Sequence, residues 1–197
     1  MRPNRRDEIL AQAIRLFAAK GFHATSVQDI ADAVGMSKAG LYSSFASKES
    51  LLEAIFYSII DGMLERLQQI VASDAEPAEK LRQAIISQVV GTADHIQPMT
   101  IYYQERRHLS ESAGQRVAAR RRAYEALLET LLAEGQAQAS FRPCDVKVTA
   151  FGIAGMCAWT YRWFHPDGRL TAAQIGSQYA DLVIGGLRPS EALPPKE

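Results

Sequence analysis

The chain has 197 residues, enough to bury a substantial core, and its 47% hydrophobic and 22% charged residues are those of an ordinary globular protein. Its formal net charge of zero at first argues against a nucleic-acid partner. The distribution is less even, because residues 1–50 contain seven Lys or Arg against five Asp or Glu, whereas the remainder contains 15 against 17. With Arg at three of the first six positions, this small basic pole is typical of a two-part DNA-binding protein.

The sequence predicts a cytoplasmic protein with no cofactor, no metal site and no membrane partner. Cys144 and Cys157 have neither metal-ligand spacing nor a CxxC partner, and we expect Cys157 to be buried. Residues 5–8 lead directly into an amphipathic helix and do not form the apolar core of a signal peptide. The apolar run at residues 150–159 is shorter than the ~20 residues that cross a bilayer.

A first helix is predicted up to Gly21, because apolar residues recur at helical spacing before it. Ile9, Ala13 and Phe17 lie on one side of this helix. A second, short helix then begins with a capping box, in one of two registers: Thr25 with Gln28, or Ser26 with Asp29.

Gly35 follows the last apolar residue of this short helix and can adopt the left-handed conformation that ends it. Ser37 is a new N-cap, and residues 38–45 form about two turns of a third helix. Two short helices joined by a three- or four-residue turn that contains Gly form the helix-turn-helix, whose second helix enters the major groove of DNA.

The remainder of the chain is also predicted to be helical, with no repeat and no strand-like alternation of useful length. Thr171 with Gln174 forms a second capping box, and Gly185 and Gly186 are expected to end the last helix. The expected helical segments are 47–72, 77–98, 99–107, 112–139, 145–164 and 171–186.

The N-terminal quarter resembles the DNA-binding domain of TetR-type transcriptional repressors. One departure is Ser43-Ser44, where the family often has an aromatic residue or His before the closing Phe. The elements that carry the resemblance are Gly21-Phe22-His23-Ala24-Thr25, Gln28-Asp29-Ile30-Ala31, Gly35-Met36-Ser37, Leu41-Tyr42-Ser43-Ser44-Phe45 and Ser47-Lys48-Glu49. The resemblance implies an all-α protein with a helix-turn-helix domain at 1–47, an effector-binding and dimerisation bundle at 48–188, and a disordered tail at 189–197.

Candidate DNA contacts come from the third predicted helix and its flanks. Lys38, Tyr42 and Lys48 are expected at phosphates, and Thr25 offers its hydroxyl at a helix N-terminus. The alternative is that the lysines are only solvated and Tyr42 is part of the core. The full expected set is Thr25, Ser37, Lys38, Ala39, Tyr42, Ser43, Ser44 and Lys48.

The predicted helix at 145–164 has two distinct apolar faces. Small residues let helix backbones approach closely, so the first face is expected to pack against a second subunit, as the last long helices do in TetR-like proteins. The alternative is that this face packs within its own subunit. Its residues are Ala150, Ala154, Cys157, Ala158 and Tyr161.

The second face carries Arg162 beside aromatic residues, where it can bind an anion or extend to solvent. The segments ERRHLS, RRRAYEALL and WTYRWFHPDGRLT resemble a TetR branch that senses acyl-coenzyme A thioesters. The resemblance therefore implies an effector with an apolar acyl group and several phosphates. The expected effector-binding residues are Tyr102, Arg106, Phe151, Gly155, Trp159 and Arg162.

No catalytic residues are predicted, because His108, His165, Asp167 and Cys144 have no nucleophile-elbow or metal-site spacing. The sequence therefore favours a homodimeric repressor that binds a palindromic DNA operator and is released by a small-molecule effector. Alternatives are a multidrug-type sensor of hydrophobic compounds, a ligand-independent DNA-binding module, and a bundle enzyme with an incidental helix-turn-helix.

Overall fold

The computed structural model describes residues 4–189, which are helical with no strand. Positions 1–3 and 190–197, which include Arg2 and nearly all of the predicted disordered tail, lie outside the described residues. No helix within 4–189 is long and apolar enough to cross a membrane. The helices are α1 (Arg5–Lys20), α2 (Val27–Val34), α3 (Lys38–Ser44), α4 (Lys48–Val71), α5 (Pro77–Asp94), α6 (Ile96–Glu105), η1 (Arg106–His108), α7 (Glu111–Ala137), α8 (Val146–Trp159), η2 (Thr160–Arg162) and α9 (Ala172–Leu187).

The chain forms two compact units, and their boundaries differ from the predicted division into 1–47 and 48–188. Unit 1 contains the described residues up to Gly62 together with His95–Arg121. Unit 2 contains Met63–Asp94 and the described residues from Arg122 onward. The long helices α4 and α7 each contribute residues to both units.

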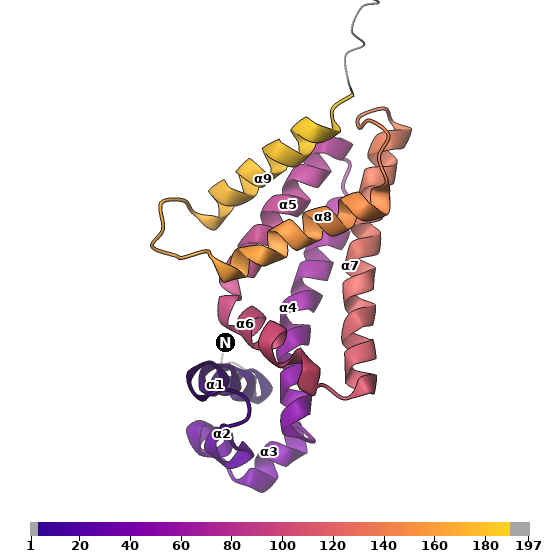
Figure 1. The fold of residues 1–197 in the computed structure, drawn as a ribbon. Helices are drawn as coiled ribbons and strands as arrows, with labels where there is room; N and C mark the ends of the chain where they lie inside the picture. The colour runs from indigo at the N-terminus through magenta and orange to yellow at the C-terminus, as the bar shows by residue number, and fades with distance from the viewer. Residues whose placement is uncertain (1–3, 190–197) are drawn as a thin grey trace, which may run out of the picture. The chain divides into compact units, whose positions relative to one another are not determined.

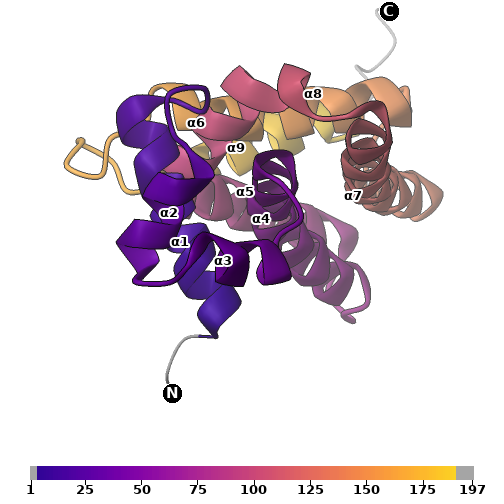
Figure 2. The same cartoon turned by 90° about the horizontal axis from the view of Figure 1, so that it is seen from below.

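Unit 1 contains the helix-turn-helix, which Figure 2 shows from below with α2 and α3 in front of α1. Of the two predicted capping boxes, α2 begins with the one formed by Ser26 and Asp29. The Ser26 hydroxyl accepts from the amide of Asp29, and the Asp29 carboxylate accepts from the amide of Ser26. These bonds also lower the pKa of Asp29 below its usual value, with the backbone bond from Ser26 as the largest cause. The sharp turn after α2 is made by Gly35 at φ 68°.

The third helix, α3, is short, and its buried side anchors it to unit 1. Ser37 caps it by accepting from the amide of Gly40, and Leu41 and Phe45 are almost completely buried. They belong to the same apolar core as Ile9 of α1 and Ile30 of α2. The side chains on the opposite side of α3 remain available for other contacts.

Unit 2 is built around α5, which packs against both α8 and α9. Figure 1 shows α9 running alongside α5. A Cβ at Gly176 would lie only 2.8 Å from the Cα of Ile86, so glycine permits the close approach of α9 to α5. In the same unit the Lys80 ammonium lies 3.0 Å from a carboxylate oxygen of Glu134, which ties α5 to α7.

The all-α class and the order of the helices confirm the sequence prediction, whereas some helix ends differ. The predicted helix at 77–98 stops at Asp94, and Pro98 lies in the first turn of α6, where proline is tolerated. Gly185 and Gly186 lie inside α9, which ends at Leu187. Their helical conformation is possible because tertiary packing outweighs a weak local propensity.

Gly35→Ala tests the turn between α2 and α3. No atom lies within 4 Å of the added Cβ, so the cost is the left-handed backbone alone, about 1–2 kcal/mol of unfolding free energy. Urea unfolding followed by circular dichroism measures it. The control is Gly114→Ala in α7, also in open space, which should stabilise by about 0.5–1 kcal/mol. Equal effects of the two substitutions would contradict the turn geometry.

Candidate DNA-binding and effector sites

The outward side of α3 carries most of the expected DNA contacts. Lys38, Ala39 and Ser43 are exposed, and Tyr42 exposes 44% of its surface although its neighbour Leu41 is fully buried. The Ser43 hydroxyl donates to the carbonyl oxygen of Gly40 and can still accept a hydrogen bond. These four side chains therefore form the exposed side of α3.

Ser37 and Ser44, two other predicted DNA contacts, make hydrogen bonds within unit 1. The exposed Ser37 hydroxyl is the N-cap of α3, and Ser44 is half-buried with its carbonyl accepting from Nη1 of Arg6. The Arg6 guanidinium also lies 4.0 Å from the ring centre of Phe45. In the same N-terminal segment, Arg5 donates to the carbonyl of Val34, so both arginines hold α1 to the helix-turn-helix.

Thr25 and Lys48, the other two predicted phosphate contacts, make hydrogen bonds within unit 1. Thr25 is fully buried, and its hydroxyl donates to the carbonyl of Gly21. The Lys48 ammonium donates to the carbonyls of Phe22 at 2.7 Å and Thr25 at 3.1 Å. It also lies 4.3 Å from the ring centre of Phe22, so its charge stabilises the turn between α1 and α2.

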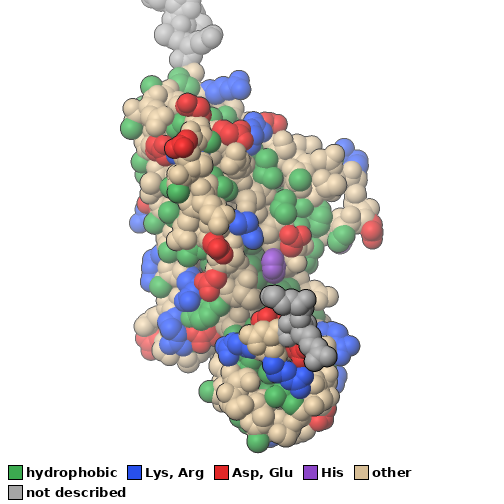
Figure 3. Space-filling model, turned by 180° about the vertical axis from the view of Figure 1, so that it is seen from behind, with side chains coloured by type: hydrophobic (Ala, Val, Ile, Leu, Met, Phe, Trp, Pro, Cys, Tyr) green, Lys and Arg blue, Asp and Glu red, His purple; other side chains and the backbone are tan. Residues whose placement is uncertain are grey.

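Basic side chains do not form one continuous field on the face drawn in Figure 3, where they alternate with acidic ones. In unit 1, Arg116 binds both carboxylate oxygens of Glu53, and Arg120 pairs with Asp61. The Arg116 contact is the main cause that lowers the pKa of the Glu53 carboxyl. Each of these two arginines therefore has an acidic partner within unit 1.

The small-residue face of α8 is turned inward. Ala150 and Cys157 are fully buried, and the Ala154 carbonyl accepts from the Gln88 side chain of α5. Ala158 and Tyr161 are half-buried. The expectation that this face contacts a second subunit is revised, because α5 of the same chain already covers its central residues. Burial also raises the pKa of the Cys157 thiol to about 12, so it stays protonated and unreactive.

The aromatic face of α8 is turned outward. Trp159 exposes 59% of its surface and Phe151 46%, and Gly155 and Arg162 are exposed as well. Val148 on the same helix and Leu182 on α9 are also exposed apolar side chains in unit 2. The effector prediction required these side chains to enclose a ligand. Within unit 2 they are exposed instead.

The two effector residues expected from the segment 99–107 lie in unit 1. Tyr102 is buried, with its ring centre 4.1 Å from that of Phe56. Arg106 is exposed at the start of η1, 5.9 Å from the ring centre of Tyr103. Tyr102 is thus a core residue of unit 1, whereas Arg106 is available to a ligand.

Sequence reasoning missed a polar set on the buried side of α5. Gln88 and Thr92 lie one turn apart and are almost fully buried, and Gln88 Oε1 and Thr92 Oγ1 have no hydrogen-bond partner within residues 4–189. A Cβ at Gly91, between them, would lie 3.0 Å from Nη2 of Arg66, so a guanidinium rests against α5 at the same level. Buried polar atoms of this kind mark candidate ligand contacts. The sequence did not indicate Gln88 and Thr92 as ligand contacts, because isolated polar residues within a helical pattern are not distinctive.

Unit 2 also has a cleft of about 370 Å³ beside the turn between η2 and α9. Its lining combines aromatic and basic side chains, among them Trp163, His165, Arg169 and Tyr179. Trp163, His165 and Arg169 are exposed, so the cleft is a surface groove and not an enclosed pocket.

Comparison with known proteins places these features in a family. Residues 9–55 match the family of bacterial regulatory proteins described as tetR, and residues 74–187 match the tetracyclin repressor-like C-terminal domain. The chain belongs to the TetR family of bacterial transcriptional regulators. This membership confirms the resemblance and the helix-turn-helix, and because the family consists of regulators and not enzymes, it also confirms the non-enzymatic prediction.

Relatives of this TetR-family regulator include named repressors. The chain is 34% identical to the transcriptional repressor KstR2 of Mycolicibacterium smegmatis over 95% of this chain and 93% of that protein. The structure of the ketosteroid regulator KstR2 of Mycobacterium tuberculosis matches with a TM-score of 0.83 and 32% identity over 96% and 98% of the two chains. AibR in complex with isovaleryl coenzyme A and operator DNA matches with a TM-score of 0.77 and 36% identity over 94% and 99%.

Lys38→Ala tests the exposed side of α3 as a DNA-binding surface. Removing one phosphate contact should weaken binding to all DNA sequences similarly and reduce the salt dependence of binding by about one counterion. Fluorescence anisotropy over a salt series measures both quantities. Lys147→Ala, which removes an exposed lysine of unit 2, is the charge-matched control. A parent-like salt slope for Lys38→Ala would remove this residue from the DNA surface.

Lys48→Ala tests the turn between α1 and α2. The variant leaves two backbone carbonyls without their charged donor, so the unfolding free energy should fall by about 1 kcal/mol or more. Lys20→Ala is the control, because its exposed pairing with Asp29 at 3.8 Å contributes little. If both variants unfold like the parent while only Lys48→Ala loses DNA affinity, Lys48 is a DNA contact after all.

Proposed function

We propose that this regulator represses transcription by binding a palindromic operator as a homodimer, and that an acyl-coenzyme A thioester lowers its operator affinity. The observation that carries the proposal is the exposed side of α3, with Lys38 and Tyr42 one turn apart, on a chain that is similar to KstR2 over most of its length. Two α3 helices in a dimer would reach major grooves about 34–36 Å apart, which requires an operator with two-fold symmetry.

The outward apolar face of α8 and α9 supports the homodimer. Its exposed residues include Val148, Phe151 and Trp159 on α8 and Leu182 on α9. Clusters of exposed large apolar side chains are uncommon on a soluble monomer and are typical of a subunit interface, so these residues are candidates for one. We therefore assign the aromatic face of α8, and not its small-residue face, to the partner subunit.

Phe151→Glu tests this interface. A charge in an apolar contact should dissociate the dimer, because the carboxylate would be buried without a partner. Sedimentation equilibrium measures the subunit stoichiometry. Ala133→Glu places the same charge on an exposed position of α7 and should leave the assembly unchanged. A parent-like dimer in Phe151→Glu would move the interface elsewhere.

The buried polar set of α5 supports an effector site within unit 2. Gln88 and Thr92 offer polar atoms that have no hydrogen-bond partner in the described part of the chain, and Arg66 offers a cation at the same level of the helix. An acyl-coenzyme A has the matching chemistry: an amide- and thioester-containing chain with an apolar acyl group, and phosphates that a guanidinium binds. AibR, which is similar over 94% of this chain, is known with isovaleryl coenzyme A bound.

Effector coupling is tested by measuring operator affinity with and without ligands. The operator is first selected from a random DNA pool, and binding is then titrated with isovaleryl coenzyme A, longer acyl-coenzyme A thioesters and free coenzyme A. An acyl-coenzyme A should raise the Kd for the operator about fivefold or more. Release by hydrophobic compounds without coenzyme A would favour the multidrug alternative, and release by none would favour a ligand-independent module.

Thr92→Val locates the effector site. Valine keeps the shape and removes a hydroxyl that has no partner within the described chain, so fold and operator affinity should be unchanged. The acyl-coenzyme A concentration needed for release should rise about two- to tenfold. Arg162→Ala is the comparison, because the sequence placed the effector on the outer face of α8. A loss of response in Arg162→Ala but not in Thr92→Val would restore that original assignment.

A further inference from the structure

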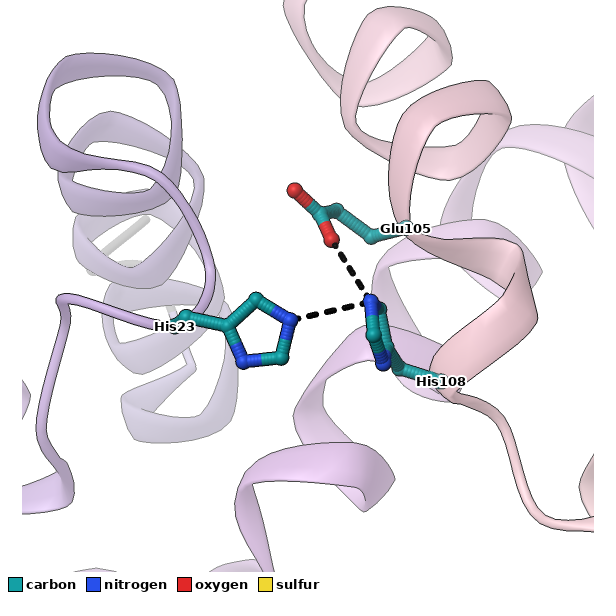
Figure 4. A group of neighbouring side chains, drawn as sticks. All are labelled: His23, Glu105 and His108. Atoms are coloured by element: carbon teal, nitrogen blue, oxygen red, sulfur yellow. Dashed lines mark hydrogen bonds and ion pairs between the residues drawn. The ribbon is translucent and has the colours of Figure 1, made fainter.

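Three side chains from two distant parts of the sequence meet on unit 1, as Figure 4 shows. His23 lies in the turn between α1 and α2, Glu105 ends α6, and His108 ends η1. The Nε2 atoms of the two histidines are 2.9 Å apart, and His108 Nε2 is 3.5 Å from Oε2 of Glu105. One ligating atom from each residue lies within 4.8 Å of those of the other two.

We propose that His23, Glu105 and His108 bind a divalent transition-metal ion of the Zn²⁺ type. Two imidazole nitrogens and one carboxylate oxygen are a ligand set that Zn²⁺ accepts, with water completing the tetrahedron. Bonds of about 2.1 Å place tetrahedral ligand atoms about 3.4 Å apart. His108 Nε2 and Glu105 Oε2 are already about this far apart. The two histidine Nε2 atoms would have to move apart by about half an ångström.

The ligands are held in place before any ion binds. The His108 ring stacks on the buried ring of Phe22, and the His23 ring meets the His108 ring edge-on at 4.2 Å between centres. Lys48 fixes the backbone of the same turn through the carbonyls of Phe22 and Thr25. Such fixed rings lower the ordering cost of binding an ion.

The present contacts of His108 and Glu105 can be exchanged for contacts to an ion. Arg107 Nε donates to His108 Nε2 at 3.2 Å, and the Nε2 atom of His23 lies 2.9 Å from the same nitrogen. Oε2 of Glu105 is buried and has no hydrogen-bond donor within residues 4–189. An ion would take the place of the Arg107 donor, whose exposed side chain can turn to solvent, and both imidazoles would ligate it through an unprotonated Nε2 with the proton on Nδ1.

Nearby charges set limits on the affinity. Glu105 contributes one negative charge, while Arg107 and the Lys48 ammonium, 3.5 Å from the His23 carbonyl, oppose a cation. A bound ion would join the turn that precedes α2 to the end of α6 and to η1, whose His108 is 85 residues from His23. It would therefore stabilise unit 1 in the arrangement that the structure describes.

The test uses the full-length protein without an affinity tag, stripped with a chelator and then dialysed. Zn²⁺ is titrated by calorimetry, and Co²⁺ is added as a spectroscopic probe, because a tetrahedral Co²⁺ site absorbs visible light. We expect one ion per chain, a visible Co²⁺ spectrum, and a higher Tm with Zn²⁺.

Two substitutions separate ligation from folding. His108→Phe keeps a ring that can stack on Phe22, and His23→Gln keeps a polar side chain in an exposed turn, so both should fold as judged by circular dichroism. Each should weaken Zn²⁺ binding at least about tenfold and abolish the Tm increase. His165→Gln removes an exposed histidine of unit 2 and should change neither. Parent-like Zn²⁺ affinity in His108→Phe and His23→Gln, or no binding by the parent, would overturn the proposal.

Discussion

The position of α3 depends on contacts made outside it. A helix of seven residues is not stable alone, because the free-energy cost of nucleating it exceeds the stabilisation from its few hydrogen bonds. Leu41 and Phe45 anchor its buried side, and Arg6 of α1 binds its C-terminal end through the Ser44 carbonyl. A movement of these anchoring residues would change the positions of Lys38 and Tyr42 without any direct contact to either side chain. A regulator of this kind can therefore be controlled from a distant site.

Local chemistry made the helix-turn-helix predictable from sequence. A capping box, a left-handed glycine and a new N-cap act within a few residues, so Ser26, Gly35 and Ser37 lie as expected even though the choice between Thr25 and Ser26 stayed open. Helix ends that depend on packing were less predictable. Gly185 and Gly186 would end an isolated helix, yet α9 continues through both to Leu187.

The candidate sites were harder to predict because they depend on which surfaces meet. Periodicity separated two apolar faces of α8, but both suit a helix contact, and only the packing of α5 shows that Ala150 and Cys157 point inward. Lys48 stood in a family motif with no local sign that its ammonium binds the Phe22 carbonyl. His23 and His108 carry no metal spacing in the sequence, because the fold alone brings them within 2.9 Å.

Reciprocal coupling between the operator and the effector is the central claim of this account. Thermodynamic linkage requires that the operator raise the Kd for the acyl-coenzyme A by the same factor by which the ligand raises the Kd for the operator. The decisive measurement is calorimetric titration of acyl-coenzyme A into the free protein and into its operator complex. We predict weaker binding to the complex by about fivefold or more, and identical affinities would contradict a ligand-responsive repressor.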